Sequence, residues 1–537
     1  MSRKLIWSLI SCLLVVIMML TACTPAANPT AAAEPTKAED ALAATKPAEP
    51  TKASDAPEAT KAPEPVMEAL DPVELIWFLD GAGEPKDAAM VLEALNNLPQ
   101  VKALNVKVNI VWYDWGSYDQ KTQLMFTSGE PCDLIFTSNW ANNYVNGAIN
   151  GNYVALDDLL PKYAPKTWAE VSPVAWTMSK VNGAIYAIPN QQIWYNAWGW
   201  ALRKDMADKY GITLDSVAKY EDMTPIMEKI LADFPEMKYQ IVQGGGPFVT
   251  GTMGYDAIPG GFGAIKQGDT TRKIVNMSEE SILRERIELS REWVQKGYAP
   301  QEVVDYATAD AARKNGFFPI SLHVEKPGFE AESKMMNGYD WIGEPIEQPV
   351  LGYVLPTMTG VCTTSKNPER ALMFFDLMYS DSEVFNMVAK GIEGQHWTWV
   401  DEEKKVIGFP KGLDAQTSGY NINTDWMIGN NFLAYYLNPD QVGAWEKTNE
   451  INKVAVLPMS GPFVFDPTPV QAEIAALTTV DKQYGEVLQA GLIDLDDAEK
   501  GIAAWVKAQK EAGIDKIIAE EQKQLDAFVA ANPDIFK

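Results

Sequence analysis

Histidine is nearly absent from this chain of 537 residues, which contains only His323 and His396. So few imidazoles argue against a histidine-rich metal site. A Ser-His-Asp triad is disfavoured for the same reason. No sequence motif in the chain indicates a cofactor-binding site. We therefore predict a protein with no catalytic residues, no metal and no cofactor.

Positive charge is also scarce relative to negative charge. The chain has 45 Lys and Arg residues against 72 Asp and Glu residues, which gives a formal net charge of -27. Nucleic acids and anionic membrane surfaces both attract proteins that present a cationic face. This balance argues against either as a partner. It fits a soluble protein that works outside the cytoplasm.

The N-terminus has the order of a secretory signal, with Arg3 and Lys4 followed by the apolar run 5–20. The tetrapeptide Leu-Thr-Ala-Cys that ends at Cys23 resembles the lipobox of bacterial lipoproteins. The resemblance implies that residues 1–22 are removed and that Cys23 is acylated, for example with palmitate. The protein would then be anchored by lipid to the cell membrane, on its extracellular or periplasmic side. An ordinary signal peptide or an uncleaved anchor is the alternative.

The segment that follows, 23–70, contains no aromatic residue, no glycine and no isoleucine, and is rich in Ala, Pro, Thr, Glu and Lys. Such a composition cannot bury enough apolar surface to offset the entropy lost on ordering. The prolines favour locally extended geometry. We predict a disordered tether that holds a folded part near the membrane.

Four cysteines occur in the chain. Cys12 leaves with the signal and Cys23 is assigned to lipid, so Cys132 and Cys362 remain. Exported proteins can form disulfides. These two thiols either pair or are buried separately as small apolar residues, and the sequence leaves both outcomes open.

Strand and helix patterns alternate after the tether. Strands are predicted at 73–80, 106–112 and 133–137, with helices at 88–98 and 118–126 between them. This alternation is typical of a parallel sheet with crossover helices.

Ligands of parallel sheets bind beyond the carboxyl ends of the strands. Asp80 ends the first predicted strand, and Asn139 and Trp140 lie in the loop that follows the third. We predict that Trp140 stacks on a ligand ring and that Asp80 and Asn139 make polar contacts.

Five motifs carry a family resemblance: Asp114–Lys121, Ser128–Glu130, Asp133–Trp140, Asp157–Leu160 and Tyr186–Asn190. Together they resemble the family 1 extracellular solute-binding proteins of ABC importers. The likeness extends over nearly all of the chain after the tether. It is strongest to a LipO-like lipoprotein subfamily with a C-terminal domain of unknown function.

The resemblance implies an α/β fold of two lobes joined by a hinge, with a ligand cleft between the lobes and a helical C-terminal region. The strand 317–324 is expected to return the chain to the first lobe. The expected divisions are 71–186 with 315–366 for the first lobe, 187–314 with 367–537 for the second, and 461–535 for the subfamily's C-terminal region within the fold 71–537.

Two further stretches supply candidate ligand contacts. Asn190 and Gln191 come just after the segment that crosses between lobes in the resembled fold. The loop 391–397 resembles the subfamily's short loop. Trp397, at its end, is predicted to be a second aromatic platform for the ligand.

The predicted function is a monomeric receptor of an ABC importer that captures a carbohydrate, an oligosaccharide in our reading, and delivers it to a membrane permease. Pyranose faces stack on aromatic rings, and sugar hydroxyls need carboxylate, amide and backbone partners. A secreted, lipid-anchored glycoside hydrolase is one alternative, because a chain with 72 acids always offers carboxylate pairs. A receptor that feeds a sensor kinase is the other, and the solute itself stays open.

Overall fold

The computed structural model describes residues 70–238, 248, 250–304, 306–352 and 354–536. The predicted signal segment 1–22, the lipidated Cys23 and nearly all of the tether 23–70 lie outside the described residues. None of the helices within the described ranges combines the length and the apolar character that a membrane span requires.

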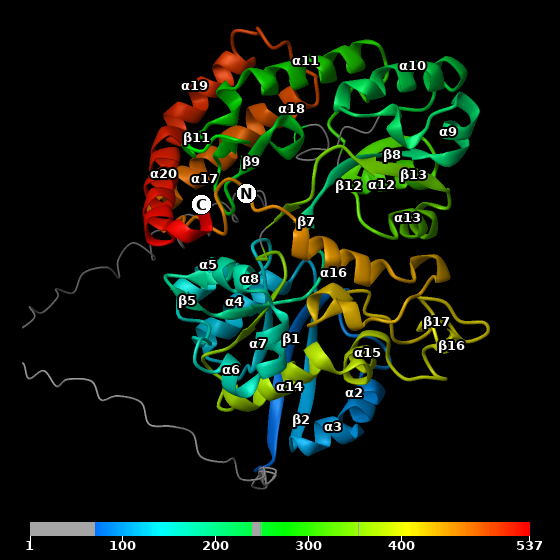
Figure 1. The fold of residues 1–537 in the computed structure, drawn as a ribbon, viewed down its shortest axis with the longest axis vertical. Coiled ribbons are helices and arrows are strands. Elements are labelled where there is room, and N and C mark those ends of the chain that lie inside the picture. The colour runs from blue at the N-terminus through cyan, green and yellow to red at the C-terminus, as the bar shows by residue number, and fades with distance from the viewer. Residues whose placement is uncertain (1–69, 239–247, 249, 305, 353, 537) are drawn as a thin grey trace, which may run out of the picture. The chain divides into compact units, whose positions relative to one another are not determined.

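A five-stranded sheet organises the first lobe, whose elements are labelled in the lower part of Figure 1. The predicted parallel arrangement is confirmed, because β1 pairs in parallel with β2 on one side and with β3 on the other. Along β2, Val106, Val108 and Ile110 are buried while Lys107 and Asn109 are exposed. In sheet order the strands are β2 (Val106–Asp114), β1 (Val73–Gly81), β3 (Leu134–Thr137), β15 (Met358–Val361) and β6 (Ala187–Pro189).

Helices cover this sheet and complete its hydrophobic core. They are α2 (Ala88–Asn97), α3 (Pro99–Ala103), α4 (Tyr118–Ser128), α5 (Tyr144–Ile149), α6 (Leu160–Tyr163), α7 (Pro165–Glu170), α8 (Pro173–Met178), α14 (Pro368–Ser380) and α15 (Ser382–Lys390). Trp77 of β1 packs edge to face on Phe374 and Phe375 of α14, at centroid distances of 6.2 and 5.8 Å. This packing corrects the expected lobe division, because α14 and α15 had been assigned to the second lobe.

The returning strand also differs from the prediction. β12 (Ile320–Val324) pairs antiparallel with β8 (Trp198–Arg203), and β8 pairs on its other edge with β13 (Trp341–Pro345). The strand that re-enters the first lobe is β15, which lies antiparallel between β3 and β6. The strand itself is predicted correctly from the apolar run, but such a run carries no information about which sheet edge the strand joins.

The second lobe combines the sheet β12-β8-β13 with a smaller sheet and many helices. Its helices are α9 (Lys204–Tyr210), α10 (Met223–Asp233), α11 (Ser281–Gln295), α12 (Tyr306–Lys314) and α13 (Phe329–Asn337), and the smaller sheet consists of β9 (Tyr255–Ala257), β10 (Ala264–Lys266) and β11 (Ile274–Val275). Short elements elsewhere are β4 (Lys180–Val181), β5 (Ala184–Ile185), β7 (Tyr195–Asn196), β14 (Val350–Leu351), β16 (Thr398–Asp401), β17 (Val406–Gly408) and α16 (Ala444–Val454).

The C-terminal region is helical, as predicted. It contains α17 (Gln471–Val480), a π-helical turn (Asp481–Gly485), α18 (Glu486–Gln489), α19 (Ile502–Ala512) and α20 (Ile514–Ala531). One apolar face of the last helix is buried, and it includes Ile514, Ile517 and Leu525. They pack with Ile258 and Phe465 in one hydrophobic cluster.

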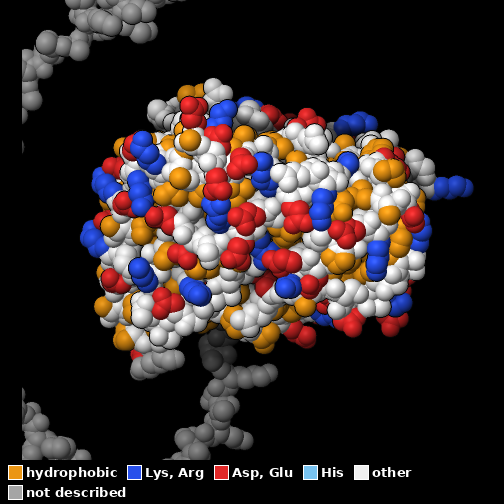
Figure 2. Space-filling view, turned by 90° about the horizontal axis from the view of Figure 1, so that it is seen from above, with side chains coloured by type: hydrophobic (Ala, Val, Ile, Leu, Met, Phe, Trp, Pro, Cys, Tyr) orange, Lys and Arg blue, Asp and Glu red, His pale blue; other side chains and the backbone are white. Residues whose placement is uncertain are grey.

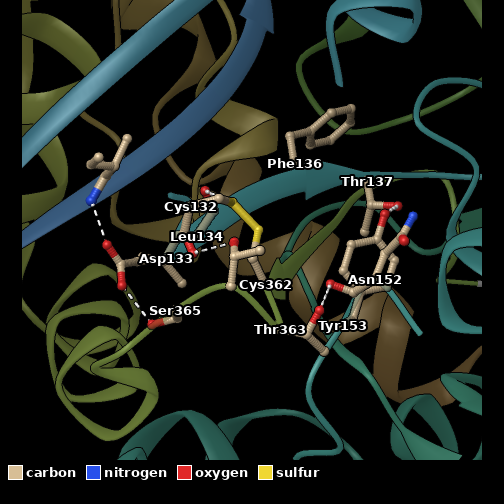
Figure 3. The surroundings of a disulfide bond; sticks show 12 residues. Cys132, Asp133, Leu134, Phe136, Thr137, Asn152, Tyr153, Cys362, Thr363 and Ser365 are labelled. Carbon is tan, nitrogen blue, oxygen red and sulfur yellow. Dashed lines mark hydrogen bonds between the residues drawn. A yellow bond between two sulfur atoms is a disulfide. The ribbon is translucent and has the colours of Figure 1, made fainter. Parts of the chain in front are cut away.

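A disulfide joins Cys132 and Cys362, which settles the question that the sequence left open (Figure 3). Cys132 lies just before β3 and Cys362 directly follows β15, so the bond joins the ends of two paired strands. Beside it, the Asp133 carboxylate accepts hydrogen bonds from Ile76 N and from the Ser365 hydroxyl. The position where the chain re-enters the first lobe is therefore held both covalently and by hydrogen bonds.

Figure 2 shows a face on which acidic and basic side chains of the described residues are interspersed. Several ion pairs lie within the second lobe. Arg284 of α11 contacts Glu288 at 3.0 Å and Asp496 at 2.9 Å, and Arg291 contacts Asp494 at 2.9 Å. Exposed pairs of this kind each add at most about 1 kcal/mol to stability.

Candidate functional site

The carboxyl ends of the first three strands meet at one edge of the sheet. Gly81 at the end of β1 is aligned with Asp114 at the end of β2, and Trp115 N donates to Gly81 O at 3.0 Å. β3 ends at Thr137, beside β1. The loops that follow these strands therefore start close together, as the parallel arrangement requires.

Three tryptophans from distant parts of the chain gather at this edge, and we call them the tryptophan cluster: Trp115, Trp140 and Trp426. Trp115 is stacked on Trp426 with 8° between the ring planes and 6.4 Å between centroids. Trp140 lies 6.1 Å from Trp115 and 6.2 Å from Trp426. Trp115 is 48% and Trp140 46% exposed. Large aromatic rings left open on a loop surface are a typical feature of a binding site.

Local contacts hold the Trp140 ring in place. Its indole Nε1 donates to Pro356 O at 2.8 Å, and its ring packs on Phe136 of β3 at 5.6 Å. The neighbouring Asn139 is partly exposed, and its backbone N donates to Leu355 O at 3.0 Å. These contacts fix the loop after β3 and leave about half of the Trp140 surface open.

Asp80 places a carboxyl group inside the end of β1. Its side chain is 1% exposed, and Oδ1 accepts a hydrogen bond from Gly81 N at 2.8 Å. Burial, with a smaller contribution from the nearby acids Asp119 and Asp114, raises the pKa of Asp80 to about 6, against the lowering effect of the Gly81 hydrogen bond. A buried carboxyl group with so little compensation is costly to the fold, which is a common feature of functional positions.

A pocket of about 470 Å³ lies in the second lobe. Its lining combines aromatic, acidic and glycine positions: Trp198, Tyr255, Phe262, Asp256, Glu347, Asn196, Gly251, Gly260 and Gly261, together with eight further residues between Thr250 and Pro458. Its volume lies within the usual range for small-molecule sites.

Glu347 is the most strongly perturbed acid of this pocket. Its Oε1 accepts a hydrogen bond from Trp198 N at 2.9 Å, and its buried Oε2 has no hydrogen-bond partner among the described residues. Burial raises the pKa of Glu347 to about 7, and the charge of Asp256 adds to the shift. At neutral pH this side chain can therefore both donate and accept hydrogen bonds.

Family models account for most of the fold. Residues 98–384, more than half of the chain, match the bacterial extracellular solute-binding protein family. The chain belongs to this family. A second match, to a domain of unknown function (DUF3502), spans residues 459–530. Both agree with the resemblance predicted from the motifs.

Proteins similar to this solute-binding protein include examples from Streptococcus pneumoniae and Bifidobacterium longum. A carbohydrate ABC transporter substrate-binding protein of Streptococcus pneumoniae serotype 4 is 25% identical over 468 residues, which is 83% of this chain and 89% of the relative. The crystal structure of the N-glycan transport solute-binding protein (NgtS) of Streptococcus pneumoniae superposes with a TM-score of 0.74 at 23% identity, covering 86% of this chain and 99% of that one.

Two further structures have the same fold. The same streptococcal protein in complex with Man5GlcNAc gives a TM-score of 0.64 at 22% identity and covers 86% of this chain and 99% of that one. An extracellular solute-binding protein of Bifidobacterium longum subsp. infantis gives 0.56 at 15% identity, with coverages of 85% and 98%. The two-lobe fold is thus shared widely at low identity.

Two predicted contacts of this solute-binding protein lie at the crossing between lobes, in its packed interior. Asn190 is fully buried, and its amide donates to Met427 O at 2.8 Å and accepts from Gly429 N at 3.1 Å. Gln191 is 3% exposed, and its backbone N donates to Gly429 O at 2.8 Å. Asn190 therefore acts as a structural link between the crossing segment and residues 427–429.

Trp397 also has a packing role. It is buried, its Nε1 donates to Gly391 O at 3.0 Å, and its ring packs on Trp399 and Tyr435 at 4.9 and 5.4 Å. No ring contact within the described residues links Trp397 to the tryptophan cluster. We therefore leave Trp397 and Asn190 out of the site proposed below.

Sequence reasoning missed Trp426 and chose Trp140 without its neighbour Trp115. Trp115 follows the end of β2 directly, so the strand-end argument that selected Trp140 applies equally to it. Trp426 is separated from both by more than 280 residues, and no local spacing connects them. Within the described residues, no group of three or more His, Cys, Asp or Glu side chains is arranged to hold a metal ion.

Proposed function

We propose that this protein is the solute receptor of an ABC importer and that it binds a carbohydrate, in the form of an oligosaccharide, with the tryptophan cluster as its main stacking surface. The mutually packed rings of the tryptophan cluster, open to solvent at Trp115 and Trp140, carry this proposal, and they lie at the sheet edge where β1 ends with the buried Asp80. Flat apolar faces of sugar rings stack on indoles, and the hydroxyl groups at their edges need acceptors such as carboxylates. The saccharides named with the streptococcal relatives support the same class of ligand.

The contact residues we propose are Asp80, Asn139 and Trp140 from the strand-end prediction, with Trp115 and Trp426 added. All five come from loops or strand ends at one edge of the first-lobe sheet or from the loop that packs there. We also keep Gln191, at the crossing between the lobes, as a proposed ligand contact. Its Oε1 is buried without a hydrogen-bond partner among the described residues, so it is available to a ligand.

Calorimetry with a panel of glycans, Man5GlcNAc among them, tests the proposal. Trp115→Ala and Trp140→Ala should each weaken binding by about ten- to a hundredfold, on the order of 1 to 3 kcal/mol. Trp168→Ala is a matched control, because Trp168 is also a solvent-exposed, stacked indole, 37% exposed and 5.0 Å from Trp176. If both cluster variants bind with wild-type affinity, the site lies elsewhere. If no glycan of the panel binds, the ligand class is wrong.

The role we propose is binding without chemistry, in agreement with the receptor family to which the chain belongs. Incubation of the protein with an oligosaccharide that it binds, followed by chromatography of the sugar, examines this directly. The sugar should be recovered intact. Release of shorter products at a rate proportional to protein concentration would instead identify a glycoside hydrolase.

The partner we propose is the permease of an ABC importer. The receptor, as a monomer, would deliver its bound glycan to the membrane subunits of that permease. Cross-linking in cells grown on the ligand, followed by mass spectrometry, should recover permease subunits. Recovery of a histidine kinase in their place would assign the receptor to a sensory system. Light scattering should give the mass of one chain.

We also propose that Cys23 carries the lipid that anchors the protein at the extracytoplasmic membrane face. Cys23→Ser should abolish labelling by a fatty acid and move the protein from the membrane fraction to the soluble fraction. Glycan affinity should not change, because the anchor precedes the folded part. Retention of label in the membrane pellet would refute the lipobox assignment.

A further inference from the structure

One wall of the second-lobe pocket is the turn of a β-hairpin. β9 and β10 pair antiparallel with Ala257 aligned to Ala264, and residues 258–263 connect them. Gly260, Gly261 and Phe262 of this turn line the pocket. We call residues 258–263 the pocket turn.

A carboxylate from the C-terminal helix holds the pocket turn. Glu521 of α20 is fully buried, its Oε1 accepts a hydrogen bond from Phe262 N at 2.7 Å, and its Oε2 accepts from Gly263 N at 3.0 Å. Both oxygens of one side chain thus bind two successive backbone amides. Hydrogen bonds to a carboxylate are among the stronger ones in proteins.

Glycines make this close approach possible. A Cβ atom on Gly261 would lie 2.6 Å from Glu521 Oε1, and one on Gly263 would lie 2.6 Å from Oε2. Both distances are well inside van der Waals contact. The two glycines and the glutamate therefore form a matched arrangement across two segments that are more than 250 residues apart in the sequence.

Two further hydrogen bonds join the same segments. Met459 N donates to Asp256 Oδ2 at 2.7 Å, and Phe465 N donates to Pro259 O at 2.9 Å. Pro458, the residue just before Met459, lines the pocket itself. The domain of unknown function at 459–530 thus bonds to the hairpin both before and within the pocket turn.

We infer that the C-terminal domain, residues 459–530, shapes the second-lobe pocket by fixing its wall, with Glu521 as the positioning residue, and that the pocket receives one ring of the oligosaccharide. This inference rests on the proposed function for its ligand. The pocket offers the rings of Trp198 and Tyr255 for stacking and the acids Asp256 and Glu347 for hydroxyl groups. Burial raises the pKa of Glu521 to about 7, against the lowering effect of its two backbone hydrogen bonds.

Hydrogen exchange measured by NMR or by mass spectrometry tests the inference without any ligand. In the wild-type protein the amides of Phe262 and Gly263 should be protected from exchange to the same extent as the amides of α20. The reason is that Glu521 ties the pocket turn to α20, so that the two segments should unfold locally as one unit. In Glu521→Gln, which keeps one acceptor oxygen but brings an NH₂ group against an amide donor, the two amides should exchange at least about tenfold faster. Amides of β1 in the first lobe should be unaffected.

Calorimetry with Man5GlcNAc then connects the wall to binding. Glu521→Gln should weaken binding by about tenfold. Glu511→Gln is the matched control, because Glu511 is exposed on the neighbouring α19 and pairs only loosely with Lys507 at 3.7 Å. The control should change neither exchange at the pocket turn nor affinity.

The outcomes separate the two proposals. If no glycan binds the wild-type protein, the proposed function fails, and the exchange of Phe262 and Gly263 still decides whether Glu521 holds the wall. If the wild-type protein binds and Glu521→Gln binds equally well, the inference is overturned. Should Glu521→Gln fail to fold, unprotected amides at Phe262 and Gly263 in the wild-type protein would overturn it, and protection equal to that of α20 would support it.

Discussion

Replacing Asp80 with asparagine should stabilise the folded protein near pH 8 and at the same time weaken glycan binding. The carboxyl group is 1% exposed and accepts a hydrogen bond from Gly81 N at 2.8 Å. An asparagine has nearly the same shape and keeps an oxygen for that amide. It removes the charge that burial disfavours. A position that costs stability yet supports binding is expected to show this opposite response.

The size of the effect follows from the pKa of Asp80, which burial raises from 3.8 to about 6. One pKa unit corresponds to about 1.4 kcal/mol, so the shift amounts to up to about 3 kcal/mol. Because the folded-state pKa lies above the unfolded one, the folded state binds the proton more tightly. The associated stability is fully present below pH 3.8 and is lost as the pH rises through about 6. Asparagine does not titrate, so the variant does not lose this stability as the pH rises.

Urea denaturation followed by tryptophan fluorescence, at about pH 4 and about pH 8, measures the difference. The stability of Asp80→Asn relative to wild type should rise by up to about 3 kcal/mol between the two conditions. Asp158→Asn serves as control, because Asp158 is an exposed acid of the same lobe. A difference between Asp80→Asn and wild type that does not change with pH would refute the reasoning about burial. Wild-type glycan affinity in the variant would remove Asp80 from the site.

Three more predictions follow from other features. Reduction of the Cys132–Cys362 disulfide, which spans 230 residues, should lower stability by up to about 5 kcal/mol, and reductant should have no effect on a chain in which both cysteines are replaced by alanine. Near pH 6, below the pKa of Glu347, Glu347→Gln should bind neutral glycans about as tightly as the wild type. The glycan affinity of the wild type should change as the pH passes through about 7, and the affinity of the variant should not. A chain that begins near Asp71 should melt and bind like the mature protein, and limited proteolysis of the latter should cut first within 23–70; protection of that segment would contradict the compositional argument.

Much of the first lobe was predictable because its signals are local. The alternation of buried and exposed residues in β2 and the short apolar runs of β1 and β3 predicted three parallel strands, and parallel strands bring their carboxyl ends together. Trp140 and Asp80 were chosen as candidate contacts on that ground alone. The apolar spacing of α20 is also a local signal, and Ile514, Ile517 and Leu525 of this helix are buried.

Features that depend on which distant segments meet were not predictable. The strand β12 has the pattern of any buried strand, and its membership in the second-lobe sheet depends on pairing with β8. Trp426 joins Trp115 only because the loop that carries it packs at the sheet edge. Two cysteines 230 residues apart pair because β3 and β15 are neighbours.

The sequence by itself therefore determined the fold class and the family, and it predicted that the carboxyl ends of β1, β2 and β3 would share one sheet edge. The tertiary structure decided which tryptophans form the open surface and which, like Trp397, are buried. It also decided that Glu521 of the last helix holds a turn near residue 260. The physical reason is that strand and helix periodicity is set by neighbours a few residues away, whereas burial and hydrogen bonding of a side chain depend on whatever segment packs against it.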